Sequence, residues 1–465
     1  MFVALAPFYV ILVTLLVVML VVSFYRNHFL TALLTFAGTA LAFTTLLSHC
    51  NCLPWWAQDM LITDSTTNIM LGISLLITLV IIITGYNYFQ QIADKKEEYY
   101  LLLLSSLLGA MVMIAARNFV TFFLGLELLS IPLYAMVAYH RTKRESVEAG
   151  IKYLLLAGAS TAALVFGLAI MYGASGTMDL YTFAIYLSQL HQMPSFVLVG
   201  IGLFLGSIAF KLALAPFHVW TPDVYQGAPA PVTAYLASIG KAGAFVFLLR
   251  LVQESNISSH TPIFYILVLL SIASMLVGNL LALGQTQVKR ILAFSSIAHM
   301  GYLLIALLAG GNNGYQAGMF YLVVYMISSV GAFSSIALLS QNQREPAGVS
   351  EYSYLLQRSP LLGSVFVASV FSLAGMPLTA GFISKIYLAL AGAGAALWTL
   401  VILLVINSGI GLYYYTRMVA VVFKTQETTE KVRVPILSGI AMAIVLLIIV
   451  WLGIAPGGFL YWLVP

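Results

Sequence analysis

The sequence predicts an all-α polytopic membrane protein with about fourteen transmembrane helices. The chain is 62% hydrophobic and only 8% charged, a composition that excludes a soluble globular protein. Apolar runs of about 20 residues, the length that crosses a bilayer as a helix, follow one another along its 465 residues. Most Lys and Arg residues fall in alternate short loops between these runs, as in multi-pass membrane proteins.

Seven predicted spans occupy the N-terminal half, each an apolar run bounded by polar residues, Gly or Pro. They are Phe2–Ser23, Leu30–Leu47, Ile69–Tyr86, Tyr99–Ala115, Phe119–Tyr139, Ala149–Tyr172 and Phe196–Trp220. No basic residue precedes the first span, so we expect it to be retained and not cleaved as a signal peptide. Within Asp179–His191, Leu180, Phe183, Leu187 and Leu190 share one face, which predicts a short interfacial helix.

Seven further spans follow, and two of the fourteen carry a proline that predicts a broken helix. The seven are Pro231–Val252, Ile263–Leu283, Ile291–Ala309, Tyr315–Leu339, Leu361–Ala391, Leu397–Phe423 and Val434–Ile454. The twelfth span is too long for one straight crossing and contains Gly375-Met376-Pro377. In the seventh, we expect Pro216 to free the carbonyl of Leu212 beside Lys211.

The loop charges predict the orientation of the chain. One set of alternate loops holds thirteen basic residues: Arg26, Lys95, Lys96, Arg141, Lys143, Arg144, Lys289, Arg290, Arg344, Arg358, Lys424, Lys431 and Arg433. The other set holds Asp59, Asp64, Asp179 and Glu254, with Arg117 its clear basic member. The positive-inside rule then places both termini outside, on the periplasmic side of a bacterial inner membrane. The positive charge is a topology signal and does not imply a nucleic-acid partner.

Few ionisable residues remain at membrane depth. They are Glu127, Lys211, Lys241, Lys385, His299 and, at a margin, His218. A cation at the bilayer centre costs about 2.5–3.5 kcal/mol on insertion scales, so such residues usually carry function. We therefore predict that these six form a proton path. The alternatives are a kinked helix with a snorkelling Lys211, a neutral hydrogen-bonded Glu127, and a structural His299 held by neighbouring serines.

The placement of the two breaks predicts an inverted repeat. Lys211 precedes Pro216 in a span that runs inward, whereas Lys385 follows Pro377 in a span that runs outward. Both lysines thus fall on the outer side of their breaks, as two inverted halves require. The predicted division is 1–98 for three N-terminal helices, 99–255 and 256–425 for two five-helix repeats, and 426–465 for the last helix.

The sequence His49-Cys50-Asn51-Cys52 invites a metal-site interpretation. Three close ligands do not complete a structural zinc site, and a disulfide across one residue is strained. We therefore interpret both cysteines as incidental residues of an outer loop and expect no metal.

Four stretches resemble the antiporter-like subunit N family of proton-pumping NADH–quinone oxidoreductase, respiratory complex I. They are Gly125–Leu133, Lys211–Val232, Gln287–Tyr302 and Leu373–Lys385. The resemblance covers nearly the whole chain, and the turn Gln226–Val232 favours subunit N over its sister subunits. Lysine in place of glutamate on the twelfth span favours the same assignment.

The resemblance implies roles for four residues. Glu127 is then the glutamate of the fifth helix, Lys211 its partner, Lys241 the connecting lysine and Lys385 the terminal one. It also implies that sister antiporter-like subunits and small helical subunits of the membrane arm are partners. FMN, iron–sulfur clusters and quinone are expected on partner subunits. The sequence itself has neither iron–sulfur cysteine spacing nor a Gly-rich dinucleotide loop. A subunit of a multisubunit cation/proton antiporter is the alternative function, and a plain solute transporter is the third.

Overall fold

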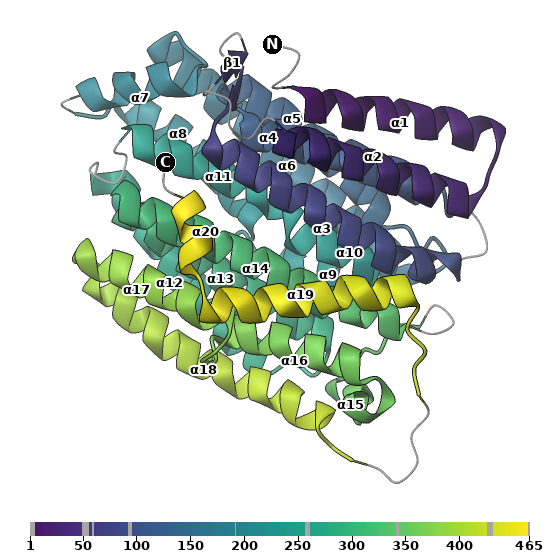
Figure 1. The fold of residues 1–465 in the computed structure, drawn as a ribbon. Coiled ribbons are helices and arrows are strands. Elements are labelled where there is room, and N and C mark those ends of the chain that lie inside the picture. The colour runs from purple at the N-terminus through teal and green to yellow at the C-terminus, as the bar shows by residue number, and fades with distance from the viewer. Residues whose placement is uncertain are drawn as a thin grey trace.

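The computed structural model describes residues 5–48, 55–57, 60–91, 95–190, 192–255, 261–340, 344–425 and 431–463. Within these ranges the chain forms a bundle of helices that run mostly along one direction (Figure 1). Thirteen described helices are long and apolar enough to cross a membrane, and two shorter apolar helices, Pro360–Ala374 and Ala380–Gly394, follow each other in the twelfth predicted span. The predicted all-α class is confirmed. The residues His49 to Cys52 lie outside the described residues.

Polar residues ahead of several helices fix where they begin. The side chains of Asp64, Asn118 and Asp179 each accept a hydrogen bond from a backbone N–H in the first turn of the helix that follows. The first eight helices are α1 (Ala6–Phe24), α2 (His28–Ser48), α3 (Ser65–Gln90), α4 (Glu98–Ala115), α5 (Phe119–Val137), α6 (Arg144–Ser175), α7 (Leu180–Gln189) and α8 (Ser195–Leu212). The predicted interfacial helix is α7. The strands β1 (Trp55–Ala57) and β2 (Leu61–Thr63) form a small antiparallel pair.

The second half of the chain supplies the centre of the bundle. Its elements are α9 (Trp220–Gly227), α10 (Ala230–Ala237), α11 (Ile239–Ser255), α12 (Thr261–Leu283), α13 (Val288–Ala309), α14 (Gly311–Leu339), the 3₁₀ turn η2 (Val349–Tyr352), α15 (Leu355–Arg358), α16 (Pro360–Ala374), α17 (Ala380–Gly394), α18 (Trp398–Val422), α19 (Ile436–Ile454) and α20 (Gly457–Trp462). The helices α10, α11 and α13 are buried over most of their length, whereas α1, α2 and α6 lie at the periphery.

The seventh predicted span breaks earlier than the proline indicates. Helix α8 ends at Leu212, because Ala213 adopts left-handed backbone with φ 62°. Helix α9 begins only at Trp220, so the predicted break in this span is confirmed, although it starts before Pro216. Pro216 already lies outside the helix, and the expected release of the Leu212 carbonyl by this proline is therefore wrong.

The break predicted in the twelfth span is confirmed, and a third break was not predicted. Helix α16 ends where Gly375 adopts φ +80°, a conformation that glycine tolerates without strain, and α17 begins after Thr379. The eighth span is interrupted at Ser238, with φ −103° and ψ −88°, between α10 and α11. This third break lies three residues before Lys241.

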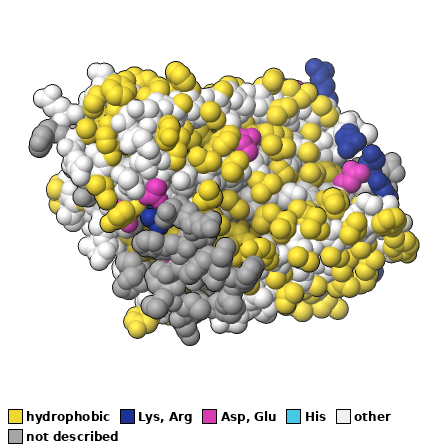
Figure 2. Space-filling model, turned by 90° about the horizontal axis from the view of Figure 1, so that it is seen from above, with side chains coloured by type: hydrophobic (Ala, Val, Ile, Leu, Met, Phe, Trp, Pro, Cys, Tyr) yellow, Lys and Arg dark blue, Asp and Glu magenta, His cyan; other side chains and the backbone are white. Residues whose placement is uncertain are grey.

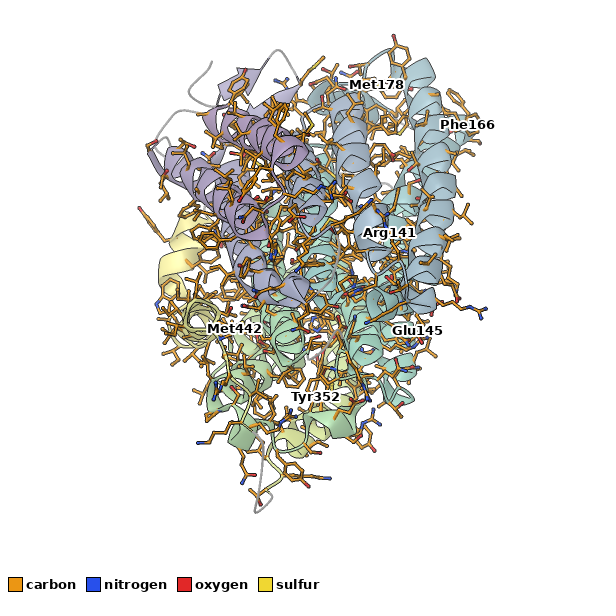
Figure 3. The ribbon with its side chains drawn as sticks, turned by 90° about the vertical axis from the view of Figure 1, so that its right-hand side faces the viewer. Arg141, Glu145, Phe166, Met178, Tyr352 and Met442 are labelled. Carbon is orange, nitrogen blue, oxygen red and sulfur yellow. The ribbon has the colours of Figure 1, made fainter. Side chains whose placement is uncertain are left out.

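The surface separates into a broad apolar belt and charged ends. Figure 2 shows hydrophobic side chains over most of the length and Lys and Arg side chains gathered at one end. We call this the basic end; the loops 25–27, 138–143 and 284–287 and the segment 344–348 lie there. Figure 3 looks onto it, with Arg141, Glu145 and Tyr352 labelled, and shows Phe166 pointing outward from α6. Phe166 is 61% exposed, which suits a lipid-facing helix.

Close packing at the second break gives a prediction about folding. A Cβ on Gly381 would overlap the carbonyl oxygen of Ser372, where α17 lies against the end of α16. We expect Gly381→Ala to cost at least about 1–3 kcal/mol and to lower the amount of folded chain in membranes. The control is Gly394→Ala at the other end of α17, where a Cβ would meet nothing within 4 Å. Equal amounts of both variants would contradict this packing.

Candidate functional site

Five of the six predicted residues lie at depth on different helices of the bundle. Lys211 (α8), Lys241 (α11) and His299 (α13) are 4%, 1% and 4% exposed. Glu127 (α5) and Lys385 (α17) are partly buried. A cation with so little exposure does not reach either surface, so the snorkelling alternative for Lys211 is wrong.

Lys211 is held by hydroxyl groups of two neighbouring helices. Its Nζ donates to Ser130 Oγ on α5 at 2.7 Å and lies 3.5 Å from Tyr153 OH on α6. These residues line a cavity between α5, α6 and α8 with room for about one water molecule. The lysine therefore has neutral partners around its ammonium group.

Glu127 approaches the same cavity without pairing directly with Lys211. Its carboxylate accepts a hydrogen bond from Thr161 Oγ1 at 2.8 Å, and Thr161 lines the cavity. Among the described residues, no hydrogen bond or ion pair joins Glu127 to Lys211. Ser130 follows Glu127 by three residues, about one helical turn, so it stands between the two charges. The carboxylate therefore interacts with the lysine electrostatically, without a direct hydrogen bond or ion pair.

Lys241 makes the link between the two halves of the bundle. Its Nζ donates to Ser296 Oγ on α13 at 2.5 Å, and it lies 5.8 Å from the ring centroid of Tyr225 on α9. Ser296 Oγ also bonds to Tyr325 OH at 2.5 Å and to Tyr225 OH at 3.4 Å. The hydroxyl of Ser296 is therefore a junction between the lysine and two tyrosines.

His299 lies one turn beyond Ser296 on α13, and tyrosines hold its imidazole. Tyr321 OH is 2.6 Å from Nδ1 and Tyr415 OH is 3.1 Å from Nε2. Ser295 bonds to Tyr415 instead of to the imidazole. The expectation that adjacent serines hold His299 is therefore wrong.

Lys385 uses the backbone that its broken helix sets free. Its Nζ donates to the carbonyl oxygen of Ala374, the last residue of α16, at 2.7 Å. Gly375 ends the helix there, and the carbonyl loses its helical partner. Lys385 and His299 line a second cavity, between α13, α14, α16 and α17, with room for about one water molecule.

The two small cavities correspond to each other. The first lies between the second, third and fourth helices of the predicted repeat 99–255, and the second lies between the equivalent helices of 256–425. Each is lined by a lysine on a broken helix.

Aromatic rings occupy the space between Lys211 and Lys241. Tyr153 stacks on Trp220 with centroids 4.7 Å apart, and Trp220 meets Tyr225 edge-on at 6.5 Å. Tyr225 in turn faces Lys241. These rings separate the first lysine from the junction at Ser296, so a proton needs water or side-chain motion to pass here.

His218 is not brought into this group. It lies between α8 and α9, partly exposed, and its Nδ1 has no hydrogen-bond partner among the described residues. No described hydrogen bond joins it to the other five residues. No contact in the structure therefore supports the predicted role of His218 in the proton path.

Sequence reasoning missed the hydroxyl partners. Ser130 and Ser296 lie three residues from Glu127 and His299, so helical spacing was a usable signal. The tyrosines come from α6, α9, α14 and α18, and no spacing in the sequence connects them to the lysines that they face. Within the described ranges, no group of three His, Cys, Asp or Glu residues is placed to hold a metal ion.

Known proteins are similar to this chain over most of its length. Residues 116–411 match the family model described as NADH:quinone oxidoreductase/Mrp antiporter, TM. NADH-quinone oxidoreductase subunit N of Methylococcus capsulatus is 40% identical, covering 97% of this chain and 92% of that protein. The subunit N of Ectopseudomonas mendocina is also 40% identical, covering 98% and 94%.

Solved structures share the fold. A chain of respiratory complex I from Thermus thermophilus with bound aureothin superposes with a TM-score of 0.84 at 31% identity, covering 98% of both chains. A chain of the Mrp complex from a Dietzia species reaches 0.89 at 21% identity, covering 100% of this chain and 96% of that one, and shows the fold alone. Given the near-complete coverage at 40% identity, the chain belongs to the subunit N family of NADH-quinone oxidoreductase.

Proposed function

We propose that this chain translocates protons as a membrane subunit of NADH–quinone oxidoreductase. The observation that carries the proposal is the set of three lysines and one histidine at depth, bonded to hydroxyls and a freed carbonyl. Ionisable residues at membrane depth mark proton relays in pumps and transporters. A lysine bonded to neutral groups keeps suitable partners whether it carries two or three protons.

In this proposal each residue has a role. The negative charge of Glu127 favours the protonated form of Lys211. When a neighbouring subunit moves Glu127 away from Lys211, Lys211 releases its proton. Lys241 and His299 relay charge through Ser296, and Lys385 exchanges protons with the outer solution. The basic end faces the cytoplasm and both termini the periplasm of a bacterial inner membrane. The halves 99–255 and 256–425 act as inverted repeats, flanked by 1–98 and 426–465, and the matching cavities support this division.

The redox chemistry belongs to partner subunits. NADH, FMN, iron–sulfur clusters and quinone are handled outside this chain, and other membrane-arm subunits, including the sister antiporter-like subunits and small helical ones, transmit the driving force. Isolation of the tagged chain from its own membranes tests this. We expect the tagged chain to be isolated together with NADH–quinone reductase activity, and the isolated complex to pump protons after reconstitution. Isolation with cation/proton antiporter subunits, and sodium/proton exchange without NADH, would support the antiporter alternative instead.

The indirect contact of Glu127 with Lys211 gives a second prediction. Glu127→Gln keeps shape and hydrogen bonding to Thr161 but removes the negative charge, so pumping falls several-fold, whereas Glu127→Asp retains more activity. The measurement is the rate of proton uptake by inverted vesicles during NADH oxidation. If Gln and Asp variants pump alike, Glu127 supplies packing and not charge.

The freed carbonyl at Lys385 gives a third prediction, on access from outside. In a chain lacking Cys50 and Cys52, Lys385→Cys reacts with a small water-soluble thiol reagent added on the periplasmic side, whereas Lys211→Cys does not. Mass spectrometry of the isolated chain measures the labelling. Equal protection of the two cysteines would rule out an outward route at Lys385.

A further inference from the structure

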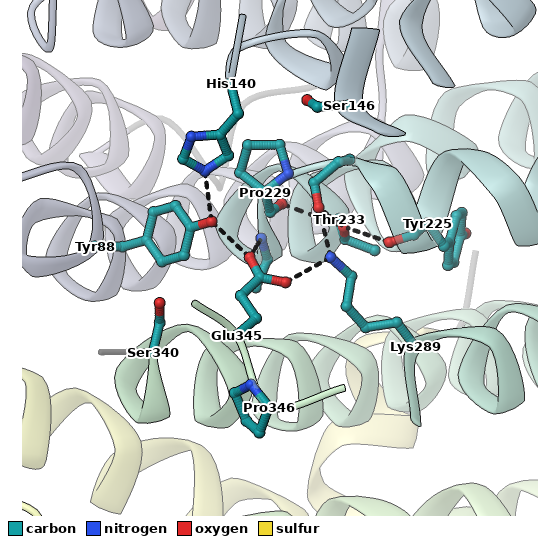
Figure 4. A network of polar contacts seen from close by, with 12 residues as sticks. Tyr88, His140, Ser146, Tyr225, Pro229, Thr233, Lys289, Ser340, Glu345 and Pro346 are labelled. Atoms are coloured by element: carbon teal, nitrogen blue, oxygen red, sulfur yellow. Dashed lines mark hydrogen bonds and ion pairs between the residues drawn. The ribbon is translucent and has the colours of Figure 1, made fainter. Parts of the chain in front are cut away.

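A second polar cluster lies at the basic end, apart from the lysines at mid-membrane (Figure 4). Its centre is the carboxylate of Glu345, in the segment between α14 and η2. Glu345 Oε2 accepts from Lys289 Nζ at 2.7 Å, and Oε1 accepts from Tyr88 OH at 2.6 Å. Tyr88 OH also lies 2.8 Å from His140 Nε2. The four side chains come from α3, α13 and two separate loops.

The same carboxylate caps the helix that leads to Lys241. Oε1 of Glu345 accepts the backbone N–H of Ala230, the first residue of α10, at 2.7 Å. The carboxylate also complements the positive end of that helix dipole. Lys289 Nζ donates to the carbonyl of Ala228, just before α10. Both members of the ion pair are thus hydrogen-bonded to the backbone at the start of α10.

A buried ion pair of this kind is not needed for folding alone. The side chains of Lys289 and Glu345 are 6% and 15% exposed. Replacing such a pair with apolar residues is often neutral or stabilising, since desolvation offsets the attraction. The charges of this pair are therefore open to a role besides folding.

A cavity of about 520 Å³ at the basic end has this cluster in its wall. Tyr88, His140, Lys289 and Glu345 all line it, and the exposed Arg344 is also among its lining residues. The volume holds several water molecules. Water thus contacts a chain of three hydrogen-bonded groups that ends at a carboxylate.

The polarity of the chain follows from the donors available. The Tyr88 hydroxyl gives its one proton to Glu345, so its oxygen accepts from His140 Nε2–H. In a neutral imidazole, Nδ1 is then the acceptor. Burial, reinforced by Lys143, lowers the pKa of His140 to about 4, which leaves the ring neutral. Burial raises the pKa of Glu345, but the charge and hydrogen bond of Lys289 outweigh it and the net pKa is lowered.

One face of α13 connects the cluster to the mid-membrane lysines. Lys289 and Ser296 are seven residues apart, about two turns or 10 Å along the axis. Ser296 holds Lys241, and Tyr225 OH reaches the same hydroxyl. Thr233 Oγ1 lies 3.3 Å from the carbonyl oxygen of Tyr225 (Figure 4), which places polar groups along part of this interval.

We propose that the cluster Tyr88–His140–Glu345–Lys289 is the inlet through which protons from the solution at the basic end reach Lys241. This inference rests on the proposed proton translocation and adds the uptake site. His140 Nδ1 takes a proton from cavity water, the Nε2 proton passes to Tyr88 oxygen, and the Tyr88 proton passes to Glu345 Oε1. Lys289 then gives a proton inward through water and takes the Glu345 proton in return, which restores the ion pair. The relay is reset when the Tyr88 hydroxyl turns back toward Glu345 and His140 returns to its first tautomer, with Nδ1 giving a proton to cavity water and Nε2 taking one from it.

The test uses the whole complex in inverted vesicles, so that the basic end faces the medium. Tyr88→Phe removes the relay hydroxyl and keeps the ring, and Glu345→Gln removes the carboxylate. The control is Tyr352→Phe, which removes a buried hydroxyl from the same region, donated to the Pro346 carbonyl at 3.0 Å. Proton pumping and NADH oxidation are measured against medium pH.

We expect both relay variants to lower pumping at least about tenfold at alkaline pH, since one proton-transfer group typically contributes about 10²-fold or more, and we expect the control to pump normally. We expect the loss of pumping to become smaller as the medium is acidified, because a higher proton concentration raises the rate of uptake through an impaired inlet. Besides its own members, the charged and titratable groups around the cluster are Lys143, Glu145, Arg344, Glu351 and Tyr352.

If the relay variants pump like wild type at every pH, the inlet proposal is wrong. The proposed function still stands in that case, because the wild-type complex pumps protons. An equal loss in Tyr352→Phe also overturns the inlet proposal, because the effect is then structural. Absence of pumping by the wild-type complex refutes the proposed function itself.

Discussion

Replacing Lys211 with alanine is expected to reduce proton pumping to background and to slow NADH oxidation in a tightly coupled complex. The variant removes the amine that donates to Ser130 and faces Tyr153 in the first cavity. Alanine leaves the two hydroxyls without an amine that can accept and release a proton beside them. Proton uptake and NADH oxidation by vesicles are measured together, at matched amounts of assembled complex.

The matched control is a lysine that the path does not use. Lys152 lies on α6 near the basic end, is 43% exposed along its side chain and pairs with Glu148 and Asp223. An exposed pair of this kind contributes little, so Lys152→Ala is expected to pump like wild type. Comparable loss in both variants would mean that Lys211 acts through general positive charge or assembly.

Replacing Lys241 with alanine is expected to have the next largest effect. Lys241 connects the halves because it comes from α11 and bonds to Ser296 on α13. Its loss leaves Ser296 with tyrosine partners only, and Lys385 no longer receives charge from Lys211. We expect pumping to fall at least about tenfold, since one proton-transfer group typically supplies about 10²-fold or more.

An exposed basic residue serves as the comparison for Lys241. Lys424 follows α18 and is exposed, so Lys424→Ala is expected to leave pumping unchanged. The decisive quantity is pumping per NADH oxidised, determined for both variants on the same vesicle preparation. An unchanged ratio in Lys241→Ala would show that the two halves do not communicate through this residue.

The spans and the residues at depth were predictable because composition and charge alternate on the length scale of a bilayer. Gly375 gave a usable signal for the second break, since few other residues tolerate its backbone conformation. The first break was placed wrongly because Ala213, an ordinary helix former, takes the left-handed conformation in this fold. The break at Ser238 has no proline within its own turn, so local propensity gave no warning.

The partners of the lysines were beyond prediction for a different reason. Tyr321 and Tyr415 reach His299 from helices distant in sequence, and only the packing of the bundle decides which tyrosines converge. Lys289 counted as a loop charge for topology, although it is buried and paired with Glu345, 56 residues away. Spacing within one helix is readable from sequence, but pairing between helices is not.

The central claim is that Lys211 gives up and regains its proton during turnover. Lys211→Arg tests this most directly, because arginine keeps the positive charge but does not deprotonate in proteins. The measurement is the number of protons translocated per NADH oxidised by the reconstituted complex. We predict a ratio well below that of wild type, at normal assembly. A wild-type ratio would contradict proton exchange at Lys211.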